Sequence, residues 1–291
     1  MITLVEVLTK TERFLRERGI DAPRLEAELL LCHVLRVGRM QLYLSFDRPM
    51  SGPELEQLRS VVGRRGKREP LAYIRGQRDF HAIELKVEPG VLVPRADTET
   101  LVDAALEWIR ESEEIAYIAD IGCGSGCIGL AIAHSRPSVR VYATDRSPTA
   151  LRVTRANRDA LGLQDRVAVL EGDLLRAIPE QRPIDWVVSN PPYIPTAEIE
   201  SLQPEVSNFE PREALDGGYD GLHVYRELIP AAALRARRGL LVEIGQHQAP
   251  RIIELFKLSK LEKIQTWNDL AGIVRVIGGR IPSRRTAHVD R

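Results

Sequence analysis

The sequence is poor in cysteine, and the spacing of its few cysteines excludes the usual roles of paired thiols. Only Cys32, Cys123 and Cys127 are present, and no two of them form a C-x-x-C pair. Their odd number argues against a disulfide framework and favours a reducing compartment. We interpret Cys123 and Cys127 as small packing residues. The histidines are scattered without metal-ligand spacing, so we expect no metal site.

An excess of one charge and a long hydrophobic run are both missing. Lys plus Arg and Asp plus Glu each number 41, whereas proteins that bind duplex nucleic acid usually carry a basic excess. No apolar run is long enough to cross a bilayer, and the first residues lack the basic and apolar regions of a signal peptide. We therefore expect a cytoplasmic protein with no membrane partner and no stable nucleic-acid partner.

What remains is the composition of an ordinary soluble protein, with 44% hydrophobic and 28% charged residues and a length that suits two unequal domains. Residues 1–75 carry helix-start signals at Thr3 with Glu6, at Pro23, and at Ser51. Each helix has one apolar face, which predicts a small N-terminal helical bundle. Residues 76–95 are expected to form a β-hairpin linker, with one strand over 80–87, a turn at Pro89-Gly90 and a second strand over 91–93.

From residue 96 to residue 280, strand patterns alternate with helix patterns. Helices are expected at 98–109, 127–134, 147–162, 221–238 and 249–258. Strands are expected at 116–121, 139–143, 167–170, 184–189, 240–244, 261–266 and 273–277. This order predicts a Rossmann-like α/β domain with a mainly parallel seven-stranded sheet, closed by an antiparallel hairpin. The polar residues 281–291 are expected to form a loose tail.

A glycine-rich turn follows the first strong strand and opens a helix. The glycines between Asp120 and Gly129 let the backbone approach a ligand and adopt positive φ, and the helix N-terminus offers free N–H groups. The pattern predicts a cofactor turn. It remains ambiguous, because Gly124-x-Gly126-x-x-Gly129 also satisfies the dinucleotide fingerprint.

Two carboxylates favour S-adenosylmethionine over a dinucleotide. Asp120 precedes the glycines, where its charge would repel a pyrophosphate but suits the cofactor's α-ammonium, directly or through water. Asp145 ends the next strand, where a carboxylate can accept both ribose hydroxyls, and Asp173 one strand later is placed to bond the adenine amino group. The alternative for both Asp145 and Asp173 is a loop or cap residue without a ligand. The predicted cofactor-binding residues are Asp120, Gly122, Cys123, Gly124, Gly126, Asp145, Asp173, Leu174 and Asn190.

The segment Asn190-Pro191-Pro192-Tyr193 follows the fourth strand, at the end where open α/β sheets bind ligands. An amide or aromatic amine nitrogen is a poor nucleophile because its lone pair is delocalised. The Asn190 side-chain carbonyl and the Pro191 backbone carbonyl can each accept one N–H and so aim the lone pair at a methyl group, while Tyr193 can pack on the planar group. We predict that Asn190, Pro191 and Tyr193 catalyse methylation of a planar nitrogen by positioning, with Pro192 also in substrate binding.

With these residues in hand, the chain resembles the protein N5-glutamine methyltransferases that act on peptide-chain release factors (the HemK/PrmC family). The resemblance covers almost the whole chain. Its most specific parts are the segment from Val93 to Glu99 and the loop from Glu210 to Gly218. One departure is Ala96, where the family usually has proline.

The resemblance implies a class I S-adenosylmethionine-dependent methyltransferase that yields S-adenosylhomocysteine and uses no metal. The implied substrate is the glutamine of the Gly-Gly-Gln motif in class I release factors, with its amide held by Asn190 and Pro191. It also implies that residues 1–75 help to recognise the release factor, and that Arg95 at the end of the linker and Thr98 in the catalytic domain, residues 96–280, contribute to substrate binding.

Two other functions stay open at this point. Adenine-N6 methylation of DNA or RNA would use the same four-residue motif, because the adenine amino group is also a planar NH₂; such an enzyme must flip the base and usually needs a basic surface. A non-catalytic adaptor would keep the cofactor fold for binding alone. The cluster from Arg64 to Arg68 is either a partner patch or a set of cations that favour a helix C-terminus.

Overall fold

The computed structural model describes residues 2–109 and 115–282. The chain forms two units, one made of Met1–Gln77 with Gln203–Phe209 and the other of Arg78–Leu202 with Glu210–Arg291. The predicted ranges placed residues 203–209 in the catalytic domain, whereas these residues pack with the helical unit. Most of the predicted tail, residues 283–291, lies outside the described residues.

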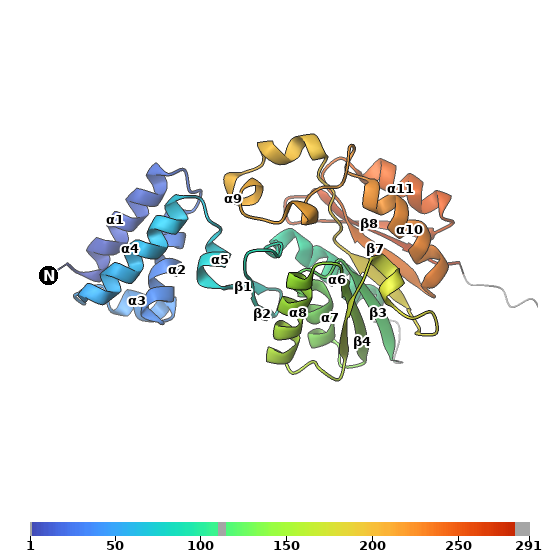
Figure 1. Ribbon diagram of the computed structural model, residues 1–291, viewed down its shortest axis with the longest axis horizontal. Helices are drawn as coiled ribbons and strands as arrows, with labels where there is room; N and C mark the ends of the chain where they lie inside the picture. Colours follow the sequence, from blue (N-terminus) through green and yellow to red (C-terminus); the bar gives the residue numbers. More distant parts are fainter. Residues whose placement is uncertain (1, 110–114, 283–291) are drawn as a thin grey trace, which may run out of the picture. The chain divides into compact units, whose positions relative to one another are not determined.

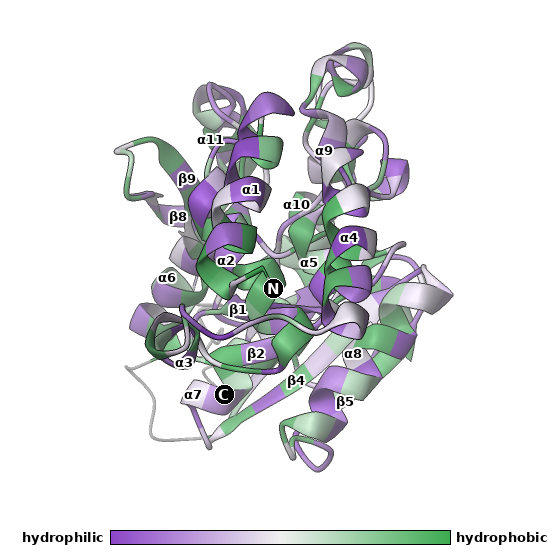
Figure 2. Ribbon diagram, turned by 90° about the vertical axis from the view of Figure 1, so that its left-hand side faces the viewer, coloured by the Kyte–Doolittle hydropathy of each residue, from purple (hydrophilic) through white to green (hydrophobic). Residues whose placement is uncertain are grey.

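The smaller unit is a bundle of short helices, drawn mainly in blue in Figure 1. Its helices are α1 (Leu4–Glu17), α2 (Pro23–Leu35), α3 (Arg39–Leu44), α4 (Gly52–Gly66), α5 (Leu71–Arg75) and α9 (Pro204–Ser207). Hydrophobic and hydrophilic residues alternate along α1, α2 and α4 (Figure 2), as expected for helices with one buried face. Leu8, Leu30, Leu31 and Leu42 are fully buried in the resulting core.

Local capping chemistry explains where these helices begin. The Ser51 hydroxyl accepts a hydrogen bond from the Glu54 N–H, and the Glu54 carboxylate accepts one from the Ser51 N–H at 2.8 Å. The Glu6 carboxylate accepts from the Thr3 N–H at 2.8 Å in the same way. Helices α3 and α5 were not predicted, because segments this short lack a full period of apolar residues.

The basic cluster that ends α4 is largely paired within the smaller unit. Arg65 is buried and donates to Glu26 and, at 2.8 Å, to Glu205. Arg68 donates to Glu205 at 2.7 Å, and Arg64 pairs with Glu69. Three cations of this cluster are therefore joined to acidic residues, one of which comes from the segment 203–209.

The hairpin in the linker region differs from the prediction. Its strands are β1 (Gln77–Phe80) and β2 (Ile83–Lys86), and residues 91–93 form no strand. The turn lies at His81, which has φ 51°, and not at Pro89-Gly90. The alternation over 80–87 predicts one strand because His81 gives no glycine or proline signal for a turn.

The larger unit contains a seven-stranded sheet with the order β5-β4-β3-β6-β7-β9-β8. Its strands are β3 (Ala116–Ile121), β4 (Val139–Asp145), β5 (Val167–Glu171), β6 (Trp186–Ser189), β7 (Gly239–Glu243), β8 (Glu262–Asn268) and β9 (Val274–Arg280). The strands from β5 to β7 run parallel, whereas β9 is antiparallel to both β7 and β8. The predicted mainly parallel sheet with a closing antiparallel hairpin is confirmed.

Helices cover both faces of this sheet (Figure 1). They are α6 (Glu99–Ile109), α7 (Cys127–Ser135), α8 (Pro148–Ala160), α10 (His223–Arg235) and α11 (Ala249–Leu258), with 3₁₀ turns η1 (Ala96–Thr98), η2 (Leu174–Ala177), η3 (Thr196–Ser201) and η4 (Arg212–Ala214). Ile118 packs in a core with α6 and α7, and its neighbour Ala119 packs in a second core with α10 and α11. Successive residues of a strand point to opposite faces, so the central strands are buried on both sides and a ligand can reach them only at their ends. Within the described ranges, no helix is both long and apolar enough to span a membrane.

Candidate active site

The candidate site lies at the carboxyl ends of the central parallel strands. Ile121 at the end of β3 pairs with Thr144 of β4 on one side and with Ser189 of β6 on the other. The chain that follows β3 leads to β4, whereas β6 extends the sheet in the opposite direction. Such a point, where the strand order reverses, is where open α/β sheets form a ligand crevice.

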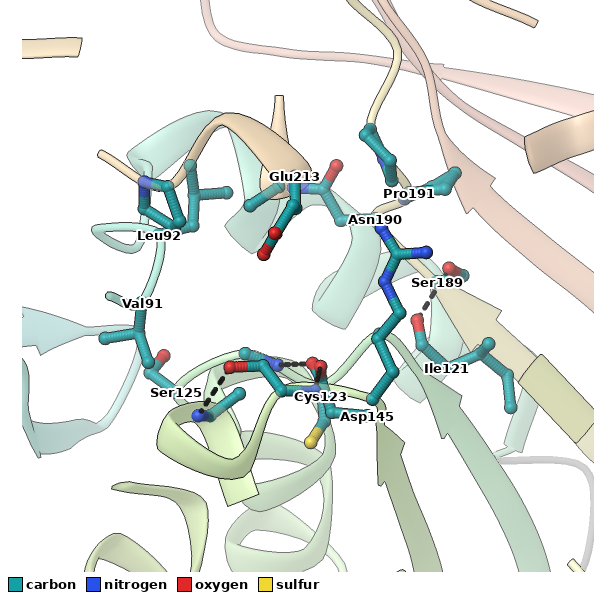
Figure 3. Close-up of a pocket in the computed structure, with 18 of the residues that line it drawn as sticks. Val91, Leu92, Ile121, Cys123, Ser125, Asp145, Ser189, Asn190, Pro191 and Glu213 are labelled. Atoms are coloured by element: carbon teal, nitrogen blue, oxygen red, sulfur yellow. Dashed lines mark hydrogen bonds between the residues drawn. The ribbon is translucent and has the colours of Figure 1, made fainter. Parts of the chain in front are cut away.

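A cavity of about 240 Å³ occupies this position, large enough for a small organic molecule and not only for water. In Figure 3, Cys123, Ser125 and Asp145 lie on one side of the open space, Asn190 and Pro191 on another, and Glu213 faces the glycine turn. The predicted residues that line it are Arg95, Thr98, Gly122, Cys123, Gly124, Asp145, Asp173, Leu174, Asn190, Pro191 and Pro192. Asp120, Gly126 and Tyr193, which were also predicted, do not line it.

The three glycines of the turn play different parts. Gly122 and Gly124 have φ of 70° and 57°, and a Cβ on either would meet no atom within 4 Å. Both line the cavity, so their missing side chains leave room for a ligand against the backbone. Gly126, at φ 83°, is packed: a Cβ there would lie 2.7 Å from Leu130 and 2.9 Å from Thr154. Gly126 therefore shapes the turn from behind.

Asp145 connects the turn to the next strand. Its Oδ2 accepts a hydrogen bond from the Gly124 N–H at 2.9 Å, and its Oδ1 accepts one from the Ser147 N–H at 2.9 Å. A carboxylate oxygen has a second lone pair, so both oxygens can still accept hydroxyl groups from the cavity. Asp145 thus holds the turn and presents acceptors to a ligand.

Asp120 lies beneath the turn and is fully buried. Its Oδ2 accepts from the Gly129 N–H at 2.9 Å, whereas Oδ1 has no hydrogen-bond partner among the described residues. Burial raises the pKa of Asp120 to about 7, and the nearby charge of Asp145 adds to the rise while the Gly129 N–H opposes it. A cation close by would lower that pKa again.

The turn after β5 forms another part of the lining. Gly172 has φ 154°, and Leu174 has φ 49°, which is rare for a branched residue. The Leu174 carbonyl accepts a hydrogen bond from the Thr144 hydroxyl at 3.3 Å, which holds the turn against β4. Asp173 is half-exposed and pairs with Arg176 at 3.1 Å.

Asn190 follows β6 directly and is held on two sides. The hydroxyl of the preceding Ser189 donates to the Ile121 carbonyl at 2.7 Å, which fixes the end of the strand against β3. The Asn190 side-chain nitrogen donates to the Thr98 hydroxyl oxygen at 3.2 Å. Asn190 and Pro191 therefore face the cavity from the strand next to the glycine turn.

Tyr193 supports this segment from the side away from the cavity. Its hydroxyl lies 3.4 Å from Oε1 of Glu243, at the end of β7, and burial raises its pKa. Its backbone carbonyl accepts from the Gln248 side-chain amide at 2.9 Å. These contacts hold the loop in place. The sequence predicts that the Tyr193 ring packs on a planar group in the cavity, whereas Tyr193 does not line the cavity.

Several lining residues were not predicted from the sequence. Arg146, Glu213 and His223 border the cavity, as do residues 90–92. Glu213 belongs to the loop that begins at Glu210, which is buried and pairs with Arg95 at 2.7 Å. Burial raises the pKa of Glu210, and Arg95 partly offsets the rise. The motif from Glu210 to Gly218 was the sequence feature that could have predicted this part of the cavity lining, although the sequence does not show where the motif lies in the fold.

This combination of a seven-stranded sheet, a glycine turn and an Asn-Pro-Pro-Tyr segment at one crevice defines a class I methyltransferase. The hMettl16 catalytic domain, solved in complex with a MAT2A 3′UTR hairpin, shares the fold with a TM-score of 0.55, at 14% identity and over 69% of this chain and 77% of that one. Residues 98–203 match the Methyltransferase small domain, and residues 6–76 match the PrmC N-terminal domain.

Curated relatives define the family more narrowly. The release factor glutamine methyltransferase of Geobacter sulfurreducens is 44% identical over 96% of this chain and 97% of its own length. That of Moorella thermoacetica is 42% identical over 93% of this chain and 96% of its own. The chain belongs to the release factor glutamine methyltransferase family.

Proposed function

We propose that this protein transfers a methyl group from S-adenosylmethionine to the side-chain amide nitrogen of the glutamine in the Gly-Gly-Gln motif of class I release factors. The observation that carries the proposal is the placement of Asn190 and Pro191 on the cavity, beside the glycine turn. Relatives that match nearly the full length and carry this activity in their names support the choice of glutamine.

The residues around the glycine turn fit S-adenosylmethionine. The open Cβ positions at Gly122 and Gly124 leave a cradle for it against the backbone, and Asp145 keeps free lone pairs for ribose hydroxyls. The buried Asp120 lies under the turn, and its ionised form suits an α-ammonium without direct contact. When bound, S-adenosylmethionine supplies an electrophilic methyl group on its sulfonium.

The chain's own part in the reaction is to position a weak nucleophile. The Asn190 Oδ1 and the Pro191 carbonyl accept the two amide N–H groups of the glutamine and hold its nitrogen toward the methyl. Positioning of this kind can supply several kcal/mol of the barrier lowering, about 1.4 kcal/mol for each tenfold in rate. The proton leaves after the nitrogen has become positive, so no strong base is required.

The partner is proposed to contact the helical unit as well as the cavity. Residues 6–76 match the PrmC N-terminal domain, and no nucleic-acid or membrane partner is proposed. Because a release factor acts in translation, we place the reaction in the cytoplasm.

The test is peptide mass spectrometry on a release factor after incubation with the protein and labelled S-adenosylmethionine. We expect one methyl group on the motif glutamine, and none on a release factor in which that glutamine is replaced by asparagine. Duplex DNA and an RNA hairpin serve as competing substrates. Label on either nucleic acid with none on the release factor would overturn the proposal in favour of adenine methylation.

A binding measurement separates the enzyme from a non-catalytic adaptor. Calorimetry with S-adenosylhomocysteine is expected to give one site for each chain. Cofactor binding without methylation of any of the three substrates would favour the adaptor, and no binding would remove the basis of the cofactor assignment.

A further inference from the structure

Three side chains from separate elements form a hydrogen-bonded chain behind the acceptor site. Asn190 after β6 donates its side-chain N–H to the Thr98 hydroxyl oxygen at 3.2 Å. The Thr98 hydroxyl in turn hydrogen-bonds the carboxylate of Glu243, the last residue of β7. Thr98 is 2% exposed and Glu243 is 1% exposed, so water does not compete for these groups.

Hydrogen-bond donors and acceptors fix the direction of this chain. An ionised carboxylate can only accept, so the single hydroxyl proton of Thr98 points to Glu243. The Thr98 oxygen then has only lone pairs left for Asn190, which must offer its NH₂ to Thr98. The other end of the Asn190 amide, the acceptor Oδ1, is thereby turned away from Thr98 and left for the substrate. An amide without this constraint could present either end.

We propose that Glu243 is a positioning residue that acts through Thr98 to hold the Asn190 amide with its oxygen toward the substrate nitrogen. The inference rests on the proposed function, because the orientation matters only if the substrate offers N–H groups. The flipped amide would face those groups with its own N–H donors and could not hold them.

The surroundings of Glu243 are those of a functional carboxylate. Its Oε2 has no hydrogen-bond partner in the described part of the chain, and its Oε1 receives the Tyr193 hydroxyl at 3.4 Å. A buried carboxylate left half-satisfied is costly for a purely structural residue. The other ionisable groups that face it are Asp97 on η1, Arg275 on β9, Tyr225 on α10 and Cys127 on α7.

The chain should depend on pH in a defined direction. Burial raises the pKa of Glu243 to about 7, while the Thr98 hydroxyl and Arg275 oppose the rise. Above this value the carboxylate accepts and the Asn190 orientation is fixed. Below it the protonated group can donate to Thr98, whose own proton is then free to turn toward Asn190. Turnover is therefore expected to fall as pH falls through about 7.

The experiment measures kcat on the release factor, at saturating S-adenosylmethionine and across pH 6 to 9, for three variants. Thr98→Val keeps the shape but removes the hydroxyl, and kcat is expected to fall about 10- to 100-fold. Thr98→Ser is expected to restore most of the rate. Glu243→Gln no longer titrates, so its kcat should lose the decline on the acid side. Thr11→Val, a buried threonine in α1, serves as the matched control and should leave kcat unchanged.

Each result decides the matter. A Thr98→Val kcat within twofold of the original, a Thr98→Ser variant as slow as the valine variant, or an acid limb that persists in Glu243→Gln would overturn the proposal. If that limb vanishes only in Asp120→Asn, the titrating group is Asp120. The S-adenosylhomocysteine affinity of Glu243→Gln is expected to be unchanged, because Glu243 does not line the cavity. Measuring this affinity shows whether the variant is correctly folded. If the unaltered protein does not methylate the release factor at all, the proposed function itself has failed, which is a distinguishable outcome.

Discussion

At the residue scale, Asn190 is the side chain on which the proposed chemistry depends. It lies on the cavity lining, and among the described residues its side chain hydrogen-bonds Thr98 alone. The strand end is held by the Ser189 hydroxyl, so removal of the Asn190 side chain is expected to leave it intact. In the proposed function Asn190 contributes an acceptor for the substrate, not a contact that holds the sheet together.

Asn190→Ala is therefore expected to lose turnover and keep cofactor affinity. Loss of an oriented hydrogen-bonding group at a reacting centre costs about 10²- to 10³-fold in kcat. Timed methylation assays on the release factor give kcat, and calorimetry with S-adenosylhomocysteine gives the cofactor affinity. Asn208→Ala, at an exposed asparagine, is the matched control. An unchanged rate in Asn190→Ala would remove the role assigned to it.

Asp120 makes a separate prediction about cofactor affinity. Burial raises its pKa to about 7, and a bound ammonium favours the charged form, so the free protein must give up a proton before it binds tightly. For such a group, affinity for S-adenosylhomocysteine should weaken about tenfold from pH 8 to pH 6. Calorimetry at several pH values measures it. Asp120→Asn should bind weakly and without this pH dependence; the same slope in that variant would assign the titration elsewhere.

Residue type and motif were enough to predict several residues that the fold brings to the cavity. Asn190, Asp145, Gly122 and Gly124 line the cavity as expected, whereas Gly126 does not. The sequence could not show that Thr98 and Glu243 meet behind Asn190, because η1 and β7 are brought together only by the folded sheet. Nor could it show that Tyr193 turns toward Glu243 and away from the cavity, since a motif does not specify which way an aromatic ring points.

At the element scale, the glycine turn combines ligand space with helix packing. Gly122 faces the cavity, and Gly126 is pressed between Leu130 and Thr154. Substitutions at the two positions should consequently fail in different ways, although both have positive φ.

Gly126→Ala is expected to lower the melting temperature and cofactor affinity together, because its methyl group clashes with two side chains. Gly122→Ala is expected to lose cofactor affinity at a smaller cost in stability, about 1 kcal/mol for the strained φ. Thermal unfolding and calorimetry measure the two quantities. Gly63→Ala in α4, where a Cβ meets nothing within 4 Å, is the control. It should raise the free energy of unfolding by about 0.5–1 kcal/mol. Equal destabilisation at both turn glycines would contradict the division of roles.

Elements differ in how well the sequence predicts them, and length explains most of the difference. The strands and long helices of the sheet domain have enough apolar periodicity to be recognised. The helix expected over 221–238 is shorter, His223–Arg235, because Leu222 and Ala236 leave helical geometry at its ends. The hairpin turn at His81 and the short helices α3 and α5 are set by tertiary packing, which leaves no strong local signal.

At the scale of the whole molecule, the chain passes between the two units three times, at residues 77/78, 202/203 and 209/210. The second and third passages carry a segment from the loop after Asn190 into the helical unit. Glu205 anchors that segment through Arg65 and Arg68.

Glu205→Gln is expected to weaken the helical unit and leave the cofactor cavity intact. Removing the charge leaves the buried Arg65 with Glu26 as its acidic partner, and the loss of one hydrogen bond between charged groups costs about 2 kcal/mol. Hydrogen exchange in α4 should become faster, while S-adenosylhomocysteine affinity stays the same, because the described residues that line the cavity all belong to the larger unit. Glu200→Gln, at an exposed acid of η3, is the control. If cofactor affinity fell as much as hydrogen-exchange protection in α4, the cavity would depend on the helical unit and the prediction would be wrong.

The segment 203–209 also limits how such a protein can evolve by recombination. If the N-terminal region were exchanged at a single junction near residue 77, the new region would lack the Glu205 that Arg65 and Arg68 pair with. The host would keep the segment 203–209 with no basic partner for Glu205. A functional exchange needs two compatible insertions in one gene. Domain shuffling is therefore disfavoured, and changes in substrate preference should accumulate by point substitution within an inherited pair of units.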